Sequence, residues 1–565
     1  HVARAEVVGF RGNRTLLMAL GADAAQARKR PFSGEAAAPP AGWVARAEWA
    51  FLGAALVLAL SLRLFAIGDR PFWVDEAATL GISRLSLDEF SRLVFPVEAN
   101  PPGYYLLMKF WYDLGGGGEA WMRLPSALAG TATLVPFYLF CRRAFGLPAA
   151  LFGAVLLAVT AQHVRFSQEA RNYALFCLVF VSGLLVMQAL VRDLAPAGPR
   201  RWLLGGALAV LSACLLYLHA TGMIAAAAIY VYGAVTLLVA GRASVRRFAL
   251  LAATGVAGLI LAAPWLVIAA SVAFSPASVM QWQPPLTLEV ALWRVHQALF
   301  AWNLHSLFWP AVAATFGGLA GAVAARRREP QLWGVVAALG FSAACFALIT
   351  AAVEPIVFER TLLFVALLMT ILVASFVGAP KARLALRCAV AAVLLVSQAR
   401  AVEIHYRRNH YGELWDDAIQ RVVRDAKNDA VLALGVFDSV VIEDTLRRQG
   451  YGRAVAVLAL PHEGPYIPLA RAMVEPTAAW LEVPPSFACG PAAATPGLWI
   501  IGREVPFTEA EEERGLPAVL ERDGAALREN LTIGKLRLQH WTSPGCPGGA
   551  PGRDGAAPDG AEAGE

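Results

Sequence analysis

The chain has 565 residues, of which 58% are hydrophobic and only 16% are charged, and its formal net charge is +6. A soluble domain does not need so much apolar sequence to fill its core, so this composition excludes an ordinary soluble protein. The sequence predicts a polytopic membrane protein whose surroundings are membrane lipids, and we expect no nucleic acid partner.

The first 47 residues, 1–47, are polar and basic. They contain no apolar core in front of a cleavage site, which argues against a signal peptide. We expect them to form a cytoplasmic tail.

Apolar segments recur along residues 48–402 at lengths close to the roughly 20 residues that a membrane-spanning helix requires. Backbone groups in lipid must pair within their own segment, and the alternation of a barrel strand is missing, so we expect helices. The segment 147–161 is among the shortest. The eleven predicted spans are 48–67, 123–141, 147–161, 172–191, 202–218, 222–240, 248–272, 307–325, 331–351, 361–379 and 388–402.

Basic residues divide the connections between these spans into two classes. Every second connection is short and basic, a pattern that marks the cytoplasmic side. The amino terminus is then inside, and both the loop after the first span and the chain after residue 402 are outside. The fourteen basic residues of these five connectors are Arg142, Arg143, Arg192, Arg200, Arg201, Arg242, Arg246, Arg247, Arg326, Arg327, Arg328, Lys381, Arg383 and Arg387.

The first long loop, residues 68–122, carries the most informative motif, the acid pair Asp75-Glu76 just beyond a span. Ser86 with Glu89 three positions on predicts the capped start of a helix. The sequence Asn-Pro-Pro-Gly at 100–103 then breaks the chain before a helix at 104–114 that is too short to span. We expect interfacial helices in this loop, and we place function here because long loops outside a rigid scaffold commonly carry it.

Residues 403–542 are predicted to form a small α/β domain outside the membrane. Apolar runs at 430–436 and 498–501 indicate buried strands, and 439–449 indicates a helix. Residues 543–565 are rich in Gly, Pro, Ala and acid and are expected to be disordered. Cys489 and Cys546 lie outside the spans, and the sequence leaves open whether they form a disulfide.

Several motifs in order resemble the GT-C membrane glycosyltransferases, in particular the branch of the protein O-mannosyltransferases and aminoarabinose transferases. The resemblance covers about residues 48–420. Relatives commonly have His where this chain has Asn100, and an aromatic residue where it has Thr361. The motifs are the acid pair, Asn-Pro-Pro-Gly-Tyr-Tyr at 100–105, Arg-Leu-Pro-Ser-Ala-Leu at 123–128, Ser-Gln-Glu-Ala-Arg-Asn-Tyr-Ala at 167–174 and Glu-Arg at 359–360.

The resemblance implies an α-helical GT-C fold of about eleven spans and a defined chemistry. Such an enzyme takes a sugar from a polyprenyl-phosphate carrier and passes it to a hydroxyl on protein, lipid or glycan, at the outer face of a bacterial cytoplasmic membrane. Asp75 is the candidate general base, with Glu76 as its tuning neighbour. Phosphate leaves as a stabilised anion without a general acid, so one base suffices, and a single displacement inverts the anomeric carbon.

The remaining candidate residues are assigned by substrate. Each has a simpler alternative: Glu169 and Arg171 can neutralise each other, Lys109 can snorkel, and Arg123 can anchor the second span. Arg360 can pair with a neighbouring glutamate, although a guanidinium fork also matches phosphate. The donor phosphate and sugar candidates are Arg360, Glu169, Arg171, Tyr173, Lys109 and Arg123, and the acceptor candidates are Tyr104, Tyr105 and Asn100.

A divalent cation is possible, because Asp75, Glu76 and Glu169 offer hard oxygen ligands. The loop has no Asp-x-Asp triplet, so we name no metal ligand and no certain cofactor.

Two other functions remain open at this point. A transporter or flippase of lipid-linked sugars would also need many spans, but should show inverted repeats or broken helices near the mid-bilayer. A membrane-anchored binding protein would act through residues 403–542 and would not need Asp75.

Overall fold

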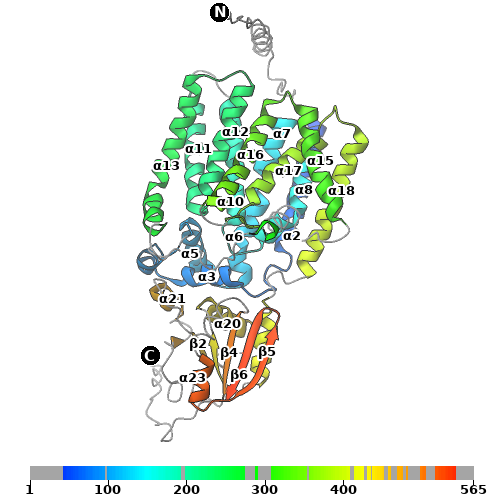
Figure 1. Ribbon diagram of the computed structural model, residues 1–565. Helices are drawn as coiled ribbons and strands as arrows, with labels where there is room; N and C mark the ends of the chain where they lie inside the picture. Colours follow the sequence, from blue (N-terminus) through cyan, green and yellow to red (C-terminus); the bar gives the residue numbers. More distant parts are fainter. Residues whose placement is uncertain are drawn as a thin grey trace, which may run out of the picture.

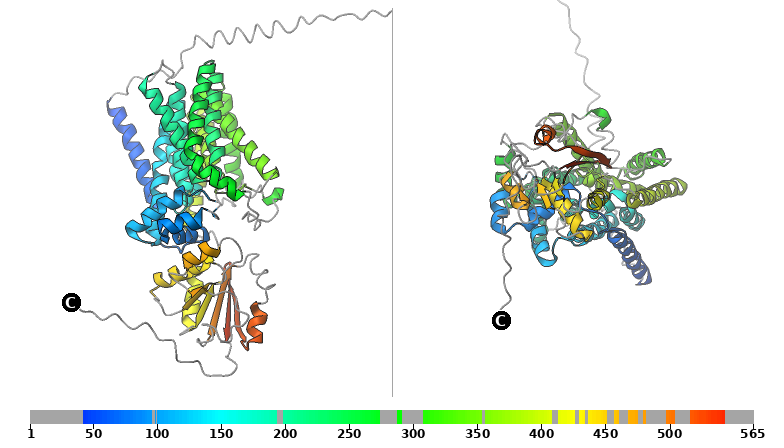
Figure 2. Two further views of the ribbon diagram at one scale, coloured as in Figure 1. Left: turned by 90° about the vertical axis from the view of Figure 1, so that its left-hand side faces the viewer. Right: turned by 90° about the horizontal axis from the view of Figure 1, so that it is seen from below.

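The computed structural model shows a helical bundle with a small sheet domain at one end (Figure 1). The first long loop lies between these two parts (Figure 2). The predicted tail 543–565, most of the tail 1–47, and both Cys489 and Cys546 are outside the described residues. The structure describes residues 42–95, 98, 100–192, 198–273, 287–290, 307–352, 356–407, 413–425, 429–433, 436–450, 456–459, 467–474, 479–480, 497–503 and 516–542.

The bundle confirms a multi-pass membrane protein. Among the described residues, nine helices are long and apolar enough to cross a membrane, and a bent pair, α8 with α9, makes up to ten. A further apolar helix, α17, is shorter than a span. With α17 included, each of the eleven predicted spans falls on a helical segment, although not every one has full spanning length. The helices are α2 (Gly42–Leu64), α6 (Glu119–Ala132), α7 (Leu134–Phe145), α8 (Leu147–Val159), α9 (Ala161–Ser167), α10 (Tyr173–Arg192), α11 (Pro199–Leu218), α12 (Gly222–Val239), α13 (Val245–Ala273), α15 (Phe308–Arg326), α16 (Pro330–Ala352), α17 (Leu363–Val377) and α18 (Leu384–Arg407).

The bend of 56° between α8 and α9 explains why the span predicted at 147–161 is short. A break frees backbone groups, which in a membrane protein need other partners. The buried Arg63 of α2 donates from Nη1 to the carbonyl of Ala158 at 3.2 Å. The backbone N–H of Ala161 donates to Gln398 Oε1 at 2.9 Å. Side chains of α2 and α18 thus satisfy the broken backbone and fix the direction of α9.

The basic connectors lie together on the face of the bundle that is remote from the sheet (Figure 1). Arg326 joins three of them, because it donates from Nη2 to the carbonyls of Phe145 (3.0 Å) and Gly378 (2.9 Å). Arg192 donates to the carbonyl of Arg143, which joins a fourth connector to that of Phe145. The alternation of loops inferred from charge therefore matches the two faces of the bundle.

The first long loop folds into short helices: α3 (Val74–Arg84), α4 (Leu87–Glu89), the π-helix η1 (Phe90–Val94) and α5 (Gly103–Gly115). The predicted cap is confirmed, because Glu89 N–H donates to Ser86 Oγ at 3.2 Å and Ser86 N–H donates to Glu89 Oε2 at 2.8 Å. The apolar side of η1 is buried within the protein, whereas α5 exposes Leu107, Phe110 and Leu114. α5 therefore presents the apolar surface expected of an interfacial helix.

The sheet domain is an α/β unit, as predicted. Its six described strands are ordered β3-β2-β1-β4-β6-β5. Strands β3, β2, β1 and β4 are parallel to one another, and β6 is antiparallel to both of its neighbours, β4 and β5. The strands predicted at 430–436 and 498–501 overlap β1 and β4, although β1 ends at Ala433, and the helix predicted at 439–449 overlaps α20, which ends at Arg448. The elements are α19 (Trp415–Asp425), β1 (Ala430–Ala433), α20 (Val436–Arg448), β2 (Ala456–Ala459), α21 (Ile467–Val474), β3 (Ala479–Trp480), β4 (Gly497–Arg503), α23 (Leu516–Arg522), β5 (Leu527–Ile533) and β6 (Leu536–Thr542).

The sheet domain docks on α3, the helix that carries the acid pair. Arg84 of α3 pairs with Glu443 of α20 at 3.3 Å. Gly81 leaves room for Met473 of α21, since a Cβ at Gly81 would lie 2.8 Å from the Met473 sulfur. A further bridge joins Arg448 Nε to Glu119 Oε1 at 3.0 Å, at the start of α6. The two parts therefore share one interface around the first long loop.

Candidate active site

Asp75 and Arg360 form a half-exposed ion pair at the sheet-facing end of the bundle. The distance from Asp75 Oδ2 to Arg360 Nη1 is 3.4 Å, and their side chains are 27% and 29% exposed. Asp75 lies in the first turn of α3, where the helix dipole stabilises a carboxylate. Arg360 lies just before α17, and its guanidinium also lies over the ring of Phe358 at 5.1 Å. A base candidate and a phosphate-binding candidate are thus brought together from distant segments.

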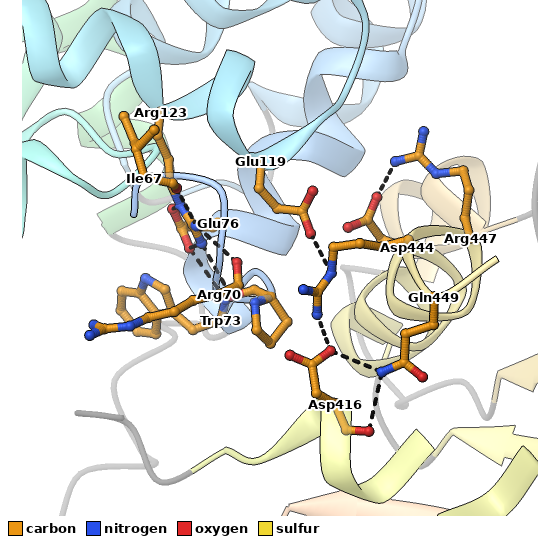
Figure 3. A network of polar contacts seen from close by, with 12 residues as sticks. Ile67, Arg70, Trp73, Glu76, Glu119, Arg123, Asp416, Asp444, Arg447 and Gln449 are labelled. Atoms are coloured by element: carbon orange, nitrogen blue, oxygen red, sulfur yellow. Dashed lines mark hydrogen bonds and ion pairs between the residues drawn. The ribbon is translucent and has the colours of Figure 1, made fainter. Parts of the chain in front are cut away.

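Glu76 is turned into the protein interior and is 1% exposed. Its two oxygens accept from Arg123 Nε and Nη2, both at 2.7 Å, in a bidentate pair (Figure 3). Glu76 Oε1 also accepts the backbone N–H of Ala170 at 2.7 Å. This carboxylate therefore joins α3 to α6 and to the connection between α9 and α10, and its surroundings favour a structural role over the predicted tuning of Asp75.

The other donors of Arg123 bind backbone carbonyls in the segment that leads into α3. Nη1 donates to the carbonyls of Ile67 and Arg70, both at 2.9 Å, and Nη2 donates to that of Pro71 at 3.1 Å. Every guanidinium donor is thereby engaged. The geometry favours the anchoring alternative for Arg123 and leaves no donor for a phosphate.

Arg171 connects the Asp75 backbone to the tyrosines. Its Nη1 donates to the Asp75 carbonyl at 3.1 Å, to Thr79 Oγ1 at 3.2 Å and to the Tyr105 hydroxyl at 3.1 Å. The guanidinium also lies 5.7 Å from the ring centre of Tyr105 and 6.0 Å from that of Tyr173. Arg171, Tyr105 and Tyr173 therefore gather beside Asp75, as the motifs predicted.

The other two acceptor candidates hold neighbours in place. Tyr104 is buried, and its hydroxyl lies 3.1 Å from Ser126 Oγ. Asn100 donates to Glu98 Oε1 from its backbone N–H (2.9 Å) and from Nδ2 (2.7 Å). Asn100 thus orients the carboxyl group of Glu98, a residue that the sequence analysis did not single out.

Glu98 is that second carboxyl group near Asp75. Burial raises the pKa of Glu98, and the hydrogen bonds from Asn100 and the charge of Arg171 oppose the shift, while the Asp75 carboxylate adds to it. Burial also raises the pKa of Tyr105, so its hydroxyl stays protonated. The only hint of Glu98 in the sequence is an acid shortly before the Asn-Pro-Pro-Gly break.

Glu169 belongs to a row of charges beside the site. Arg165 lies between two carboxylates, with Nε 3.4 Å from Glu169 Oε1 and Nη1 2.7 Å from Glu359 Oε2. Glu359 directly precedes Arg360, so the row ends at the Asp75 pair. The geometry gives Glu169 a local ion pair, with an arginine that the motif analysis did not name.

Lys109 is paired away from Asp75, along α5. Its Nζ donates to both oxygens of Asp113 at 2.7 and 2.9 Å, one helical turn later. The structure does not bring Lys109 into the Asp75 and Arg360 pair, so a donor-binding role gains no support from its contacts.

A cavity of about 50 Å³ adjoins this region. Arg165 and Glu169 line one side of it, and Trp73, His405 and Trp415 line others. Since a water needs about 10 to 15 Å³, this space holds a few waters and not a sugar. Among the described residues, no three His, Cys, Asp or Glu side chains gather into a group that could hold a metal ion.

Two residues far from the motifs also reach the site. Arg503, at the end of β4, donates from Nε to Asp438 Oδ1 at 2.9 Å. Burial lowers the pKa of Arg503, but the surrounding carboxylates, Asp75 among them, outweigh that effect and raise it. His219, between α11 and α12, packs against Tyr173 with ring centres 6.1 Å apart. No local sequence pattern connects either residue with Asp75.

Comparisons with known proteins relate the chain to one family model and to solved structures of the same fold. Residues 99–268 match the family model described as dolichyl-phosphate-mannose-protein mannosyltransferase. No curated protein sequence matches the chain. The structure of ArnT from Cupriavidus metallidurans in the apo state is similar, with 15% identity and a TM-score of 0.55, over 88% of this chain and 98% of that one.

The same ArnT bound to undecaprenyl phosphate matches with 16% identity and a TM-score of 0.51, over 89% of this chain and 98% of that chain. At this level of identity the likeness speaks for the fold. It agrees with the resemblance that the motifs carry, from the acid pair to Glu359 and Arg360. The chain has the fold of the GT-C membrane glycosyltransferases.

Proposed function

We propose that this protein is an inverting glycosyltransferase that moves a sugar from a polyprenyl-phosphate donor to a hydroxyl acceptor. The observation that carries the proposal is the pair of Asp75 and Arg360, 3.4 Å apart and each more than a quarter exposed. A carboxylate and a guanidinium that both remain accessible at a membrane-surface site supply the two groups that this reaction needs. The similar ArnT structure that binds undecaprenyl phosphate supports a donor of this type.

In the proposed reaction, the acceptor oxygen bonds to the anomeric carbon as Asp75 takes the proton of the acceptor hydroxyl. The bond between that carbon and the phosphate oxygen breaks, and the phosphate keeps the electron pair. Proton transfer to a positioned base typically contributes about 10² to 10⁴ in rate. Attack and departure occur on opposite faces in one step, which inverts the anomeric configuration.

Arg360 is proposed to hold the departing phosphate. Its charge persists in a partly dry site, and its planar fork can bind two phosphate oxygens. In the structure described here it pairs with Asp75, so a bound phosphate would draw the guanidinium from the carboxylate and leave Asp75 free to accept a proton. Donor binding would thereby prepare the base.

The sheet domain is proposed to cover the acceptor side. It docks on α3 through Arg84, Glu443 and Met473, and Arg503 of β4 lies within the electrostatic reach of Asp75. An acceptor hydroxyl that reaches Asp75 from outside the bilayer would have to pass this interface. We propose that this face of the membrane is the outer face of the cytoplasmic membrane, in keeping with the basic connectors on the opposite side.

A comparison of cells tests the function and names the substrates. Envelope glycans and polyprenyl-phosphate sugars are compared by mass spectrometry in cells with the native chain or Asp75→Asn, at matched membrane levels. Asp88→Asn is the control, because Asp88 is an exposed acid of the same loop and forms a surface ion pair with its neighbour Arg92.

The expected result with Asp75→Asn is the loss of one glycan and a build-up of its lipid-linked donor, with no change for Asp88→Asn. Unchanged profiles for both variants would reject Asp75 as the base and favour a transporter, or a binding protein that acts through the sheet domain.

A further inference from the structure

His219 is a buried imidazole that the mechanism above does not use. It follows the last residue of α11 and is 9% exposed. Its ring lies between residues of α10, with its centre 6.1 Å from that of Tyr173 and 5.4 Å from that of Phe176. Tyr173 in turn has the Arg171 guanidinium 6.0 Å from its ring centre. The imidazole therefore borders the group of residues around Asp75.

The backbone fixes the tautomer of this imidazole. The N–H of Thr221 donates to His219 Nδ1 at 3.0 Å, and Thr221 Oγ1 lies 2.8 Å from the same atom. A backbone N–H can only donate, so Nδ1 is the acceptor and carries no proton. A neutral imidazole with an acceptor at Nδ1 has its proton on Nε2. His219 thus presents one N–H donor.

That donor has no partner within the part of the chain that the structure describes. Within the described residues, the side-chain hydrogen bonds of His219 all involve Nδ1 and Thr221. Nε2 is not fully enclosed by the described residues, so water or a ligand can reach this N–H. The local role of His219, ending α11 and turning the chain, requires only Nδ1, which leaves Nε2 for another purpose.

The surroundings of His219 select an anionic ligand. Burial, together with the positive charges of Arg360 and Arg171, lowers the pKa of His219 to about 3. The imidazole is therefore neutral at physiological pH and can stand beside two guanidinium groups without charge repulsion. The same two positive charges favour an oxygen that carries negative charge. In the proposed reaction the group of that kind is the donor phosphate.

We propose that His219 donates a hydrogen bond from Nε2 to a phosphate oxygen of the polyprenyl-phosphate donor, beside Arg360. This inference rests on the proposed function and adds a donor-binding residue to it. The directional hydrogen bond from His219 orients the phosphate, whereas the positive charge of Arg360 neutralises the phosphate charge. Because the hydrogen bond is made to the phosphate and not to the sugar, the carrier lipid alone is a sufficient probe.

The test is the affinity of the purified full chain for undecaprenyl phosphate, in detergent, with three variants. His219→Asn keeps an acceptor near Nδ1 for the Thr221 N–H but has no donor at the Nε2 position. His219→Gln extends an amide N–H toward the Nε2 position. Arg360→Gln removes the proposed phosphate charge partner and serves as the reference. Thermal unfolding without lipid is recorded for each variant to show that it is folded.

We expect His219→Asn to unfold like the native chain and to bind undecaprenyl phosphate about tenfold more weakly, the scale of a hydrogen bond to a charged group. His219→Gln should bind more tightly than His219→Asn. The ratio of native to His219→Asn affinity should be the same at about pH 6 and about pH 8, because a neutral imidazole between Arg360, Arg171, Tyr173 and Thr221 does not titrate there.

Native affinity in His219→Asn, alongside weakened binding in Arg360→Gln, would overturn this inference and leave the proposed function standing. A ratio that grows as the pH falls would also overturn it, because a protonated imidazole would then be the binding group. If the native chain does not bind undecaprenyl phosphate, the proposed function itself fails, and the role of His219 fails with it.

Discussion

The two adjacent acids of the first long loop form ion pairs of the same chemistry in opposite surroundings. Asp75 pairs with Arg360 at 3.4 Å, and both side chains are more than a quarter exposed. Glu76 pairs with Arg123 at 2.7 Å in bidentate geometry, with exposed fractions of 1% and 5%. Successive residues of a helix point about 100° apart, so one turn of α3 sends the two carboxylates to different regions.

The difference separates a group that can react from one that holds the site. The buried pair is not free to bind a substrate, because Arg123 also donates to three carbonyls and Glu76 also accepts the Ala170 N–H. The exposed pair keeps atoms available for a substrate. An acid pair in a sequence is therefore not one functional unit, and the two members should respond differently to mutation.

The largest expected effect follows the loss of the Asp75 carboxylate. In Asp75→Asn we expect transfer to fall by about 10² to 10⁴, since the amide cannot accept the proton, while thermal unfolding in detergent changes little. Product formation per membrane-inserted molecule measures the first quantity. If Asp75→Asn instead lowers the unfolding temperature strongly, Asp75 has a structural role and the loss of product does not identify it as the base.

The buried pair should respond through stability. Glu76→Gln leaves the Arg123 charge buried without its partner, which costs about 3 to 5 kcal/mol in comparable cases. We expect less folded protein in the membrane and a lower unfolding temperature. Glu529→Gln is the control, because Glu529 pairs with Arg421 at 2.7 Å on the sheet domain but is 30% exposed. An unchanged unfolding temperature in Glu76→Gln would contradict the structural role.

Loss of the Arg360 charge should reduce turnover with little effect on folding. We expect Arg360→Gln to lower the rate by about 10² to 10³, the range reported for a preorganised donor at a developing charge. Arg360→Lys should recover only part of it, because an ammonium lacks the planar fork. Arg383→Gln removes an equivalent charge from the exposed connector on the far side and should be silent. Full activity of Arg360→Gln would exclude it from phosphate binding.

The smallest effect is expected at the docking interface. The pair of Arg84 and Glu443 is partly exposed, and such pairs contribute about 0.2 to 1 kcal/mol. A double-mutant cycle with Arg84→Ala and Glu443→Ala, read by unfolding in detergent, measures its coupling. A coupling well above this range would mean that the sheet domain and α3 form one cooperative unit.

Hydropathy and basic connectors predicted the helical spans and the two faces of the bundle, because both signals are local in sequence. The motifs placed Asp75, Arg171, Tyr105 and Tyr173 together. Sequence could not tell that Glu76 faces Arg123, since the partner lies on α6 and only packing decides the direction. The β5 and β6 hairpin was not anticipated, because a polar strand such as Leu527–Ile533 gives only a weak apolar pattern.

Glu98 and His219 were missed for a related reason. Neither is part of a charged motif, and each gains its meaning from residues of other helices. Asp75 and Arg171 act on the pKa of Glu98, and burial together with the charges of Arg360 and Arg171 lowers the pKa of His219. Residues of this kind are found only when the fold brings the segments together.

One measurement tests the split of the acid pair most directly: glycan product per folded, membrane-inserted molecule, compared for Asp75→Asn and Glu76→Gln in the same cells. The account predicts that Asp75→Asn is present at native levels and makes almost no product. It predicts that Glu76→Gln is scarce, yet each folded molecule retains substantial turnover. Native levels and lost turnover in Glu76→Gln, or a scarce but active Asp75→Asn, would contradict it.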